Sequence, residues 1–120
     1  MKILVVDDSK AMRMIVMRTL RQAGYEGHTI TEATNGAEAL EAIKSSAPDV
    51  VLSDWNMPEM NGLQLLQELK KQGSPIKFGF VTSEGSAEMR QQASENGALF
   101  LVSKPFTVEA FQTALDGVIS

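Results

Sequence analysis

The sequence predicts a doubly wound α/β fold, in which five parallel strands alternate with five helices. Short apolar runs alternate with segments of helical periodicity along all 120 residues, a pattern typical of βα units on a parallel sheet. The run that begins at Val50 is apolar without a break, as expected of a strand covered on both faces. Polar side chains directly follow four of the apolar runs. Because ligands of such sheets bind beyond the carboxyl ends of the strands, these side chains form a candidate site.

The first strand is expected over Lys2–Val6, where an apolar run opens the chain. The first helix is expected over Lys10–Ala23, because apolar residues fall on one stripe of that segment. Ser9 is a candidate N-cap, and Gly24 is a candidate C-cap that ends the helix. The second strand, over Thr29–Glu32, is polar enough to lie at an edge of the sheet.

The turn signal Asn35-Gly36 opens the next expected helix, Ala37–Ser45, and Pro48 prevents its continuation. The segment Trp55–Gly62 is expected to be a loop, because proline and an Asn-Gly pair interrupt it. No linker, repeat or second domain is indicated, so residues 1–120 are expected to form one domain. The remaining elements expected from the same periodicities are strands over Val50–Ser53, Lys77–Val81 and Leu99–Val102, and helices over Leu63–Lys71, Ala87–Asn96 and Val108–Ile119.

Composition argues against several classes of protein. A net charge of −4 argues against nucleic-acid binding, which needs a clustered basic surface. Arg13, Arg18 and Arg21 share one expected helix, but their spacing suits a solvated face. The chain has no cysteine, so disulfides and thiolate metal sites are excluded. No apolar run approaches the roughly 20 residues of a membrane span, and the first run is too short for a signal peptide. We therefore expect a cytoplasmic protein that binds neither nucleic acid nor membranes.

Three carboxylates are expected to converge at the carboxyl end of the sheet. Asp7 and Asp8 follow the first strand, and Asp54 follows the third. Taken alone, the Asp7-Asp8 pair also suits capping of the following helix. Like charges and burial raise carboxylate pKa values, and a divalent cation relieves the repulsion. Mg²⁺ fits best, because it prefers oxygen ligands and phosphate oxygens. With no cysteine and with His28 as the single histidine, zinc is disfavoured.

Phosphoryl chemistry is the reaction type that these residues favour. Asp54 is placed to attack phosphorus and form an aspartyl phosphate. Such transfer needs in-line positioning and neutralisation of the phosphoryl oxygens, which Mg²⁺ and the Lys104 ammonium would supply. The Thr82 hydroxyl would donate a hydrogen bond to a phosphoryl oxygen, and Ser83 is small enough to leave room for the group.

Four motifs resemble the signature of bacterial response-regulator receiver domains. They are Val5–Ser9, Ser53–Pro58, Val81–Ser83 and Lys104–Phe106. The resemblance covers the whole chain. It is strongest to the family's single-domain chemotaxis regulators, because Asn61-Gly62-Leu63 follows the Asp54 motif. It implies a flavodoxin-like (βα)5 fold with strand order 2-1-3-4-5.

The resemblance also implies roles for individual residues. Asp54 would be the phosphoacceptor and a Mg²⁺ ligand, Asp8 a direct ligand and Asp7 a ligand through water. The backbone carbonyl of Asn56 would complete the ligands from the protein. The implied roles around the phosphoryl group are the switch hydroxyl for Thr82, the phosphate-binding cation for Lys104, and a cis peptide before Pro105.

One position departs from the family pattern. Receiver domains usually carry Tyr or Phe three residues before the lysine, and here that residue is Leu101, with Phe100 one position earlier. A shift of one residue along a strand turns a side chain to the opposite face, so Phe100 is expected in the core. Trp55 is expected as a partly exposed flank of the site. Glu84 is either a solvated loop acid or, together with the Asn56 side chain, a group that orients the hydrolytic water.

Together these features indicate a phospho-accepting switch of a two-component system. It would not be an enzyme, although it would assist its own phosphorylation and dephosphorylation. The resemblance implies a histidine kinase of the chemotaxis type as donor and a flagellar motor switch protein as target. A phosphatase is a further candidate partner. The protein is expected to be a monomer.

Three alternative functions are considered, of which one stays open and two are disfavoured. A role in a phosphorelay or another regulatory pathway stays open. A Mg²⁺-dependent phosphohydrolase of the haloacid-dehalogenase type is disfavoured, because its second aspartate would fall at Asn56. An FMN binder is disfavoured because the acidic rim would repel phosphate and no Ser/Thr/Gly-rich loop follows the first strand.

Overall fold

The computed structural model describes residues 2–25, 27–83, 85–104, 106–116 and 118. Its strands are β1 (Lys2–Val6), β2 (Thr29–Ala33), β3 (Val50–Ser53), β4 (Lys77–Thr82) and β5 (Phe100–Ser103). Its α-helices are α1 (Lys10–Leu20), α2 (Gly36–Ser46), α3 (Gly62–Lys71), α4 (Ala87–Glu95) and α5 (Val108–Leu115). All strand pairs are parallel, and the order is β2-β1-β3-β4-β5. The predicted doubly wound fold and strand order are therefore confirmed.

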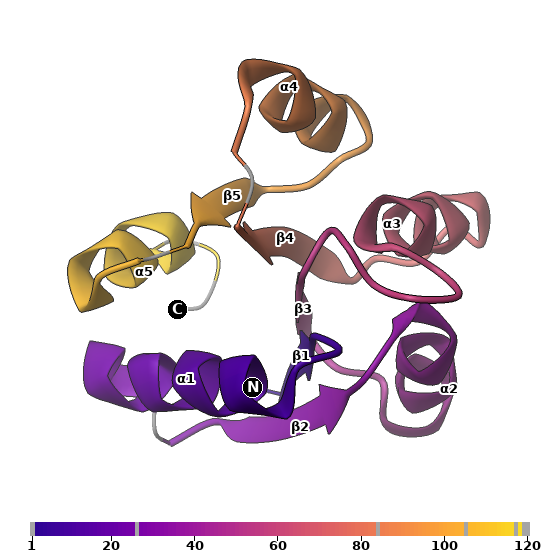
Figure 1. The fold of residues 1–120 in the computed structure, drawn as a ribbon. Coiled ribbons are helices and arrows are strands. Elements are labelled where there is room, and N and C mark those ends of the chain that lie inside the picture. The colour runs from indigo at the N-terminus through magenta and orange to yellow at the C-terminus, as the bar shows by residue number, and fades with distance from the viewer. Residues whose placement is uncertain (1, 26, 84, 105, 117, 119–120) are drawn as a thin grey trace.

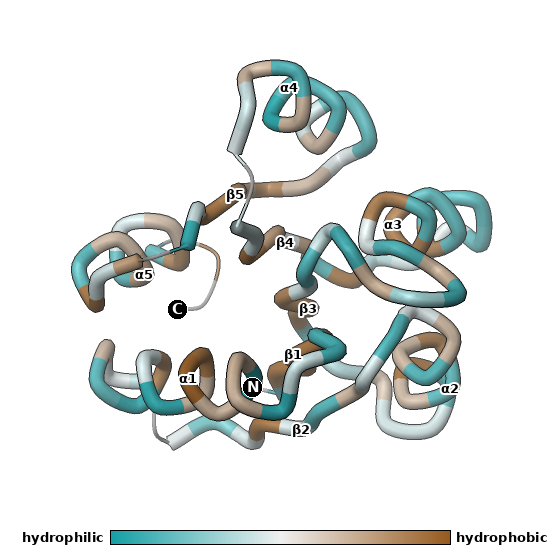
Figure 2. Tube along the Cα trace, viewed as in Figure 1, coloured by the Kyte–Doolittle hydropathy of each residue, from teal (hydrophilic) through white to brown (hydrophobic). Residues whose placement is uncertain are grey.

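The helices cover the sheet on both faces (Figure 1). On one face, α1 and α5 pack over residues of β1, β3 and β4, including the buried Val5, Leu52 and Val81. On the other face, α2, α3 and α4 pack over a second cluster that includes Phe78 and Phe80. Apolar residues accordingly concentrate along the strands, and polar residues on the outward sides of the helices (Figure 2). The polar strand β2 lies at one edge, as predicted, and β5 lies at the other.

The helix starts follow from local capping. The side chains of the N-cap residues accept hydrogen bonds from backbone amides in the first turn of each α-helix, and these residues are Ser9, Asn35, Asn61, Ser86 and Thr107. Such bonds satisfy amides that have no partner inside the helix. Each cap also fixes where the preceding loop ends. The loops between the carboxyl ends of the strands and these helix starts carry the candidate site.

Two helix ends differ from the prediction. The first helix was expected to reach Ala23, but α1 ends at Leu20 and is followed by a short segment, Arg21–Tyr25, in which Gly24 breaks the helical backbone. Gly24 within it has φ 102°, a conformation that glycine adopts without steric cost. The last helix was expected to reach Ile119, which lies outside the described residues; α5 ends at Leu115, since Asp116 is extended with ψ 125°. Within the described residues, none of the helices is both long and apolar enough for a membrane span.

Candidate metal and phosphoryl site

The three predicted carboxylates lie together at the carboxyl ends of β1 and β3. The Asp54 amide donates to the Val6 carbonyl at 2.9 Å, which continues the pairing of these strands beyond their last paired residues. One carboxylate oxygen from each of Asp7, Asp8 and Asp54 lies within 4.8 Å of the others. Parallel strands end at the same edge of the sheet, so their terminal acids meet there. The structure therefore brings these side chains into one small volume, as the sequence predicted.

The cluster is closed on the protein side and open on the solvent side. Asp7 is 3% exposed, whereas Asp8 is exposed and the Asp54 side chain is 12% exposed. All three residues offer carboxylate oxygens, the ligand type that Mg²⁺ prefers, and Mg²⁺ usually keeps several waters. An oxygen-only set with one open side fits such an ion and leaves room for a phosphate oxygen.

Lys104 reaches the same cluster from the end of β5. Its amide donates to the Thr82 carbonyl at 2.7 Å, which fixes the start of the following loop. Its Nζ lies 3.0 Å from Asp7 Oδ2 and 3.5 Å from Asp54 Oδ2. One ammonium thus faces two of three carboxylates, so the cluster keeps an excess of negative charge when all groups are ionised.

The Asp54 carboxyl has a perturbed affinity for protons. Burial raises its pKa above the ordinary value, an effect that Lys104 opposes and the Asp7 charge reinforces. The backbone amide of Trp55 donates to Asp54 Oδ1 at 2.7 Å, and the Thr82 hydroxyl also forms a hydrogen bond with this carboxyl. Both bonds favour the carboxylate form and hold it in one orientation.

Thr82 and Ser83 occupy different environments at the end of β4. Thr82 is fully buried beside Asp54, whereas Ser83 is exposed. Ser83 and Lys104 border a mainly apolar hollow of about 400 Å³, whose other lining residues are Met12, Ile15 and Phe106. Sequence reasoning assigned no function to this hollow. The three-residue spacing of Met12 and Ile15 on α1 places them on the same side of that helix.

Trp55 is not the partly exposed flank that we expected. It is 8% exposed and packs against Phe80, with ring centroids 4.7 Å apart. The reason is the start of α3, since the Gly62 amide donates to the Trp55 carbonyl at 2.8 Å and brings that helix over the indole. Trp55 is the single tryptophan of the chain, so its emission reports on this site from within the core.

Leu101 and Phe100 face opposite sides of β5, as predicted. Leu101 packs against the core that contains Phe78 and Phe80, and Phe100 packs against the core under α5. Phe100 is half-buried rather than fully enclosed. Its ring lies over Gly79, where an added Cβ would come within 2.1 Å of a ring carbon. Gly79 therefore leaves the space that this ring occupies.

The other predicted site residues are placed less completely. Asn56 is exposed in the loop after β3, and its role as a carbonyl ligand stays a prediction. Glu84 and Pro105 lie outside the described residues, so their expected roles, including the cis peptide, also stay predictions.

Of the three arginines expected on a solvated face, Arg18 and Arg21 are exposed, but Arg13 is not. Its side chain is 11% exposed; Nη1 donates to the Asp7 carbonyl at 2.7 Å and Nε to Glu32 Oε1 at 2.9 Å. The guanidinium thus ties the turn after β1 to the end of β2. Sequence spacing did not reveal this contact, because one of its acceptors is a backbone carbonyl.

Comparison with known proteins agrees with this geometry. Residues 3–116 match the family described as the response regulator receiver domain. The chain is 38% identical to chemotaxis protein CheY1 of Helicobacter pylori over 122 residues, covering 99% of this chain and 97% of that protein. It is also 38% identical to chemotaxis protein CheY of Thermotoga maritima over 117 residues, covering 98% and 96% of the two chains.

A solved structure is similar over the same length. Chemotaxis protein CheY4 of Vibrio cholerae superposes with a TM-score of 0.84 at 34% identity, covering 98% of both chains. These coverages include all the strand ends that carry the candidate site.

Proposed function

Because this chain belongs to the response regulator receiver domain family, we propose that Asp54 accepts a phosphoryl group from a histidine kinase and thereby switches the affinity of the protein for a target. The observation that carries the proposal is the setting of Asp54. Its carboxylate lies close to the carboxylates of Asp7 and Asp8, to the Lys104 ammonium and to the buried Thr82 hydroxyl.

The proposed reaction is a phosphoryl transfer between side chains. An Asp54 oxygen attacks the phosphorus of a phosphohistidine, the new O–P bond forms, and the P–N bond breaks with its electron pair going to the imidazole. Lys104 Nζ lies 3.5 Å from Asp54 Oδ2 and would pair with a phosphoryl oxygen as charge builds up there. The Trp55 amide holds the other carboxylate oxygen, so attack starts from an oriented nucleophile.

Asp7, Asp8 and Asp54 are the residues that would hold Mg²⁺. The fit rests on their oxygen-only donors and on the excess negative charge that one lysine leaves. When bound, the ion supplies positive charge that offsets repulsion between the acids and an incoming phosphoryl group. The Asn56 carbonyl is the further ligand that we propose from the loop after β3.

The phosphorylated state would differ from the free state at Thr82. A phosphoryl group adds about two negative charges and three acceptor oxygens, and the Thr82 hydroxyl, now bonded to Asp54, would donate to one of them. Movement of Thr82 would shift the loop that joins β4 to α4. Coupling between two such sites is typically about 1–3 kcal/mol, enough for roughly fivefold to 150-fold changes in affinity.

The relatives named as chemotaxis proteins favour one pathway. We propose a chemotaxis kinase as donor and a flagellar motor switch protein as target. The signal would leave through the face formed by α4, β5 and α5. Phosphoryl transfer to this protein from the purified, phosphorylated chemotaxis kinase tests the donor. Transfer only from the kinase of another pathway would assign the protein to that pathway instead.

Trp55 emission tests the site itself. Mg²⁺ and then beryllofluoride, a phosphoryl mimic, are titrated into the wild type, Asp54→Ala and the control Asp116→Asn, whose side chain is exposed at the end of α5. Wild type and control should respond in two steps, and Asp54→Ala should lose the second. An unchanged second step in Asp54→Ala would refute the phosphoacceptor assignment. Steady hydrolysis of p-nitrophenyl phosphate would instead favour a phosphohydrolase.

A further inference from the structure

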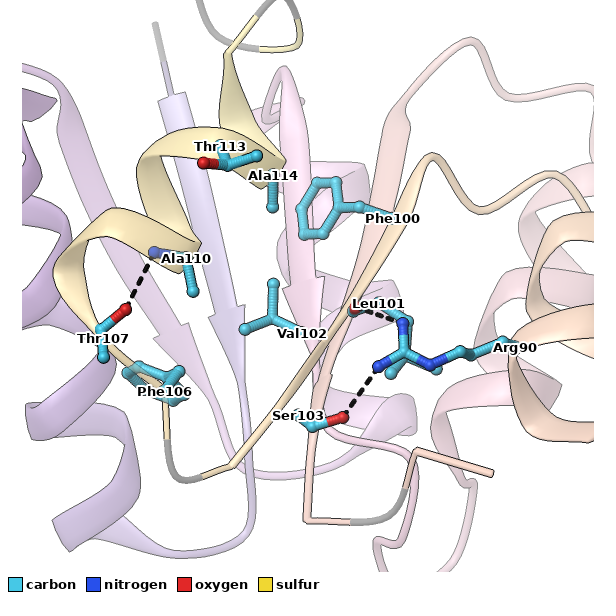
Figure 3. A pocket seen from close by; sticks show the side chains of 10 residues that line it. All are labelled: Arg90, Phe100, Leu101, Val102, Ser103, Phe106, Thr107, Ala110, Thr113 and Ala114. Atoms are coloured by element: carbon cyan, nitrogen blue, oxygen red, sulfur yellow. Dashed lines mark hydrogen bonds between the residues drawn. The ribbon is translucent and has the colours of Figure 1, made fainter. Parts of the chain in front are cut away.

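The Arg90 guanidinium joins three segments of the chain around β5. Nε donates to the Gly85 carbonyl at 3.2 Å, Nη1 to the Leu101 carbonyl at 3.1 Å and Nη2 to Ser103 Oγ at 3.0 Å. Figure 3 shows the side chain extending from α4 to β5, where it makes the last two bonds. Arg90 therefore connects the loop after β4, the helix α4 and the strand β5.

Gly85 brings this contact close to the candidate site. A Cβ added to Gly85 would lie 2.2 Å from Ser103 Oγ and 3.4 Å from Arg90 Nη2, so only a residue without a side chain permits this approach. Ser103 is the register partner of Thr82 and directly precedes Lys104. Through Ser103, Arg90 is thus linked to two proposed phosphoryl-binding residues, to Thr82 across the strand pair and to Lys104 along the chain.

The same contacts reach the free edge of the sheet. Strand β5 pairs with β4 on one side and is the last strand in the order. Edge strands present backbone groups that can pair with another chain, and Arg90 covers one such group, the Leu101 carbonyl. A groove of about 670 Å³ runs beside it, lined by Arg90 and by residues of β5 and α5 that include Phe100, Val102 and Ala114.

We propose that Arg90 is a positioning residue that links movement of the loop after Thr82 to the β5 edge. This inference rests on the proposed function, because that function supplies the movement. The guanidinium is a planar fork whose donors have fixed relative directions, so a shift of the Gly85 carbonyl changes the bonds to Leu101 and Ser103. Leu101, in the place of the usual aromatic residue, has no polar group for this task. Arg90 makes the connection from the neighbouring helix instead.

Amide NMR spectra with Trp55 emission measured on the same samples test this link. The full chain is compared with Arg90→Ala, Arg90→Lys and Ser103→Ala, before and after addition of Mg²⁺ and beryllofluoride. Gln91→Ala is the control, since it removes an exposed hydrogen bond to Glu95 on the same helix. We expect the half-saturation of the Trp55 response to stay within about twofold of wild type in every variant.

The expected difference lies in β5. Beryllofluoride should shift the Leu101 and residue 103 amides in wild type and in Gln91→Ala, and Arg90→Ala should lose about half or more of that shift. Arg90→Lys should not restore it, because the three donors of an ammonium share one nitrogen and cannot reach three acceptors that are spaced for the planar guanidinium. Ser103→Ala should lose part of it. Wild-type shifts in both Arg90→Ala and Ser103→Ala would overturn the link. A wild type with no Trp55 response would instead overturn the proposed function.

Discussion

Replacing Lys104 with methionine removes the ammonium from the acidic cluster and keeps most of the apolar stem. The lost contacts are 3.0 Å to Asp7 and 3.5 Å to Asp54, each an attraction of about 5 kcal/mol at an effective dielectric constant near 20. Desolvation of the ions offsets several kcal/mol of this attraction, and removing one partner of a buried pair costs about 3–5 kcal/mol. The Lys104 side chain is 13% exposed, so we expect a loss of about 3 kcal/mol in the free energy of unfolding without Mg²⁺.

Mg²⁺ should return most of this stability. A ligand that binds only the folded state stabilises it by about 2.7 kcal/mol at 100 times its dissociation constant. Lys104→Met should also bind Mg²⁺ more tightly than the wild type, because no ammonium competes for Asp7 and Asp54. The stability difference between the variant and the wild type should therefore shrink as Mg²⁺ is added.

Urea unfolding followed by far-ultraviolet circular dichroism measures both effects. Lys77→Met is the matched control, since Lys77 is exposed and lies at the amino end of β4, away from the cluster. The control should lose less than about 1 kcal/mol, with or without Mg²⁺. A loss in Lys104→Met that Mg²⁺ leaves unchanged would refute the view that the lysine and the ion offset the same charges.

Three further substitutions probe the packing and charges around the site. Gly62→Ala should lower the free energy of unfolding in urea by about 1–3 kcal/mol, because its methyl carbon would lie 2.2 Å from a backbone oxygen. The control Gly27→Ala, in open space, should be nearly neutral. Equal losses of stability in the two variants would contradict the packing argument. Asp54→Asn should stabilise the Mg²⁺-free protein at neutral pH by more than about 0.5 kcal/mol. Because the folded-state pKa is raised, the ionised carboxyl destabilises the fold above that pKa, so this gain should vanish in unfolding curves recorded below the ordinary value of 3.8; a gain independent of pH would exclude a charge effect. Arg13→Ala should lose about 1.5–3 kcal/mol, whereas the exposed Arg18 should tolerate alanine, and similar thermal unfolding of the two variants would refute the role of the buried guanidinium.

The strand ends were predictable because two simple signals coincide there. An apolar run marks each buried strand, and a polar residue at its end can reach solvent only beyond the sheet. Asp7 and Asp54 follow such runs, and parallel strands place both at the carboxyl end of the sheet, whatever the details of the loops. The position of β2 at an edge followed similarly from its polar residues.

The burial of Trp55 was not predictable from its neighbours in sequence. An indole beside an aspartate at a strand end is exposed unless another element covers it. Here Asn61 starts α3 with a capping box, and Gly62 allows the helix to begin in contact with the Asp54 backbone. The deciding interaction joins residues seven positions apart through a backbone carbonyl, for which side-chain periodicity carries no signal.

The same reasoning explains why the two arginines escaped prediction. Arg13 and Arg90 each bind a backbone carbonyl on another element. Every residue has such an acceptor, so the sequence cannot specify which one an arginine will find. A long side chain on a helix rim can extend to solvent or fold back over a strand end, and only the helix position decides between them. Because α4 lies beside the edge strand, folding back lets Arg90 satisfy a carbonyl that β4 cannot reach. Its place therefore follows from the tertiary arrangement, and a change in that arrangement at the loop after Thr82 must act on it directly.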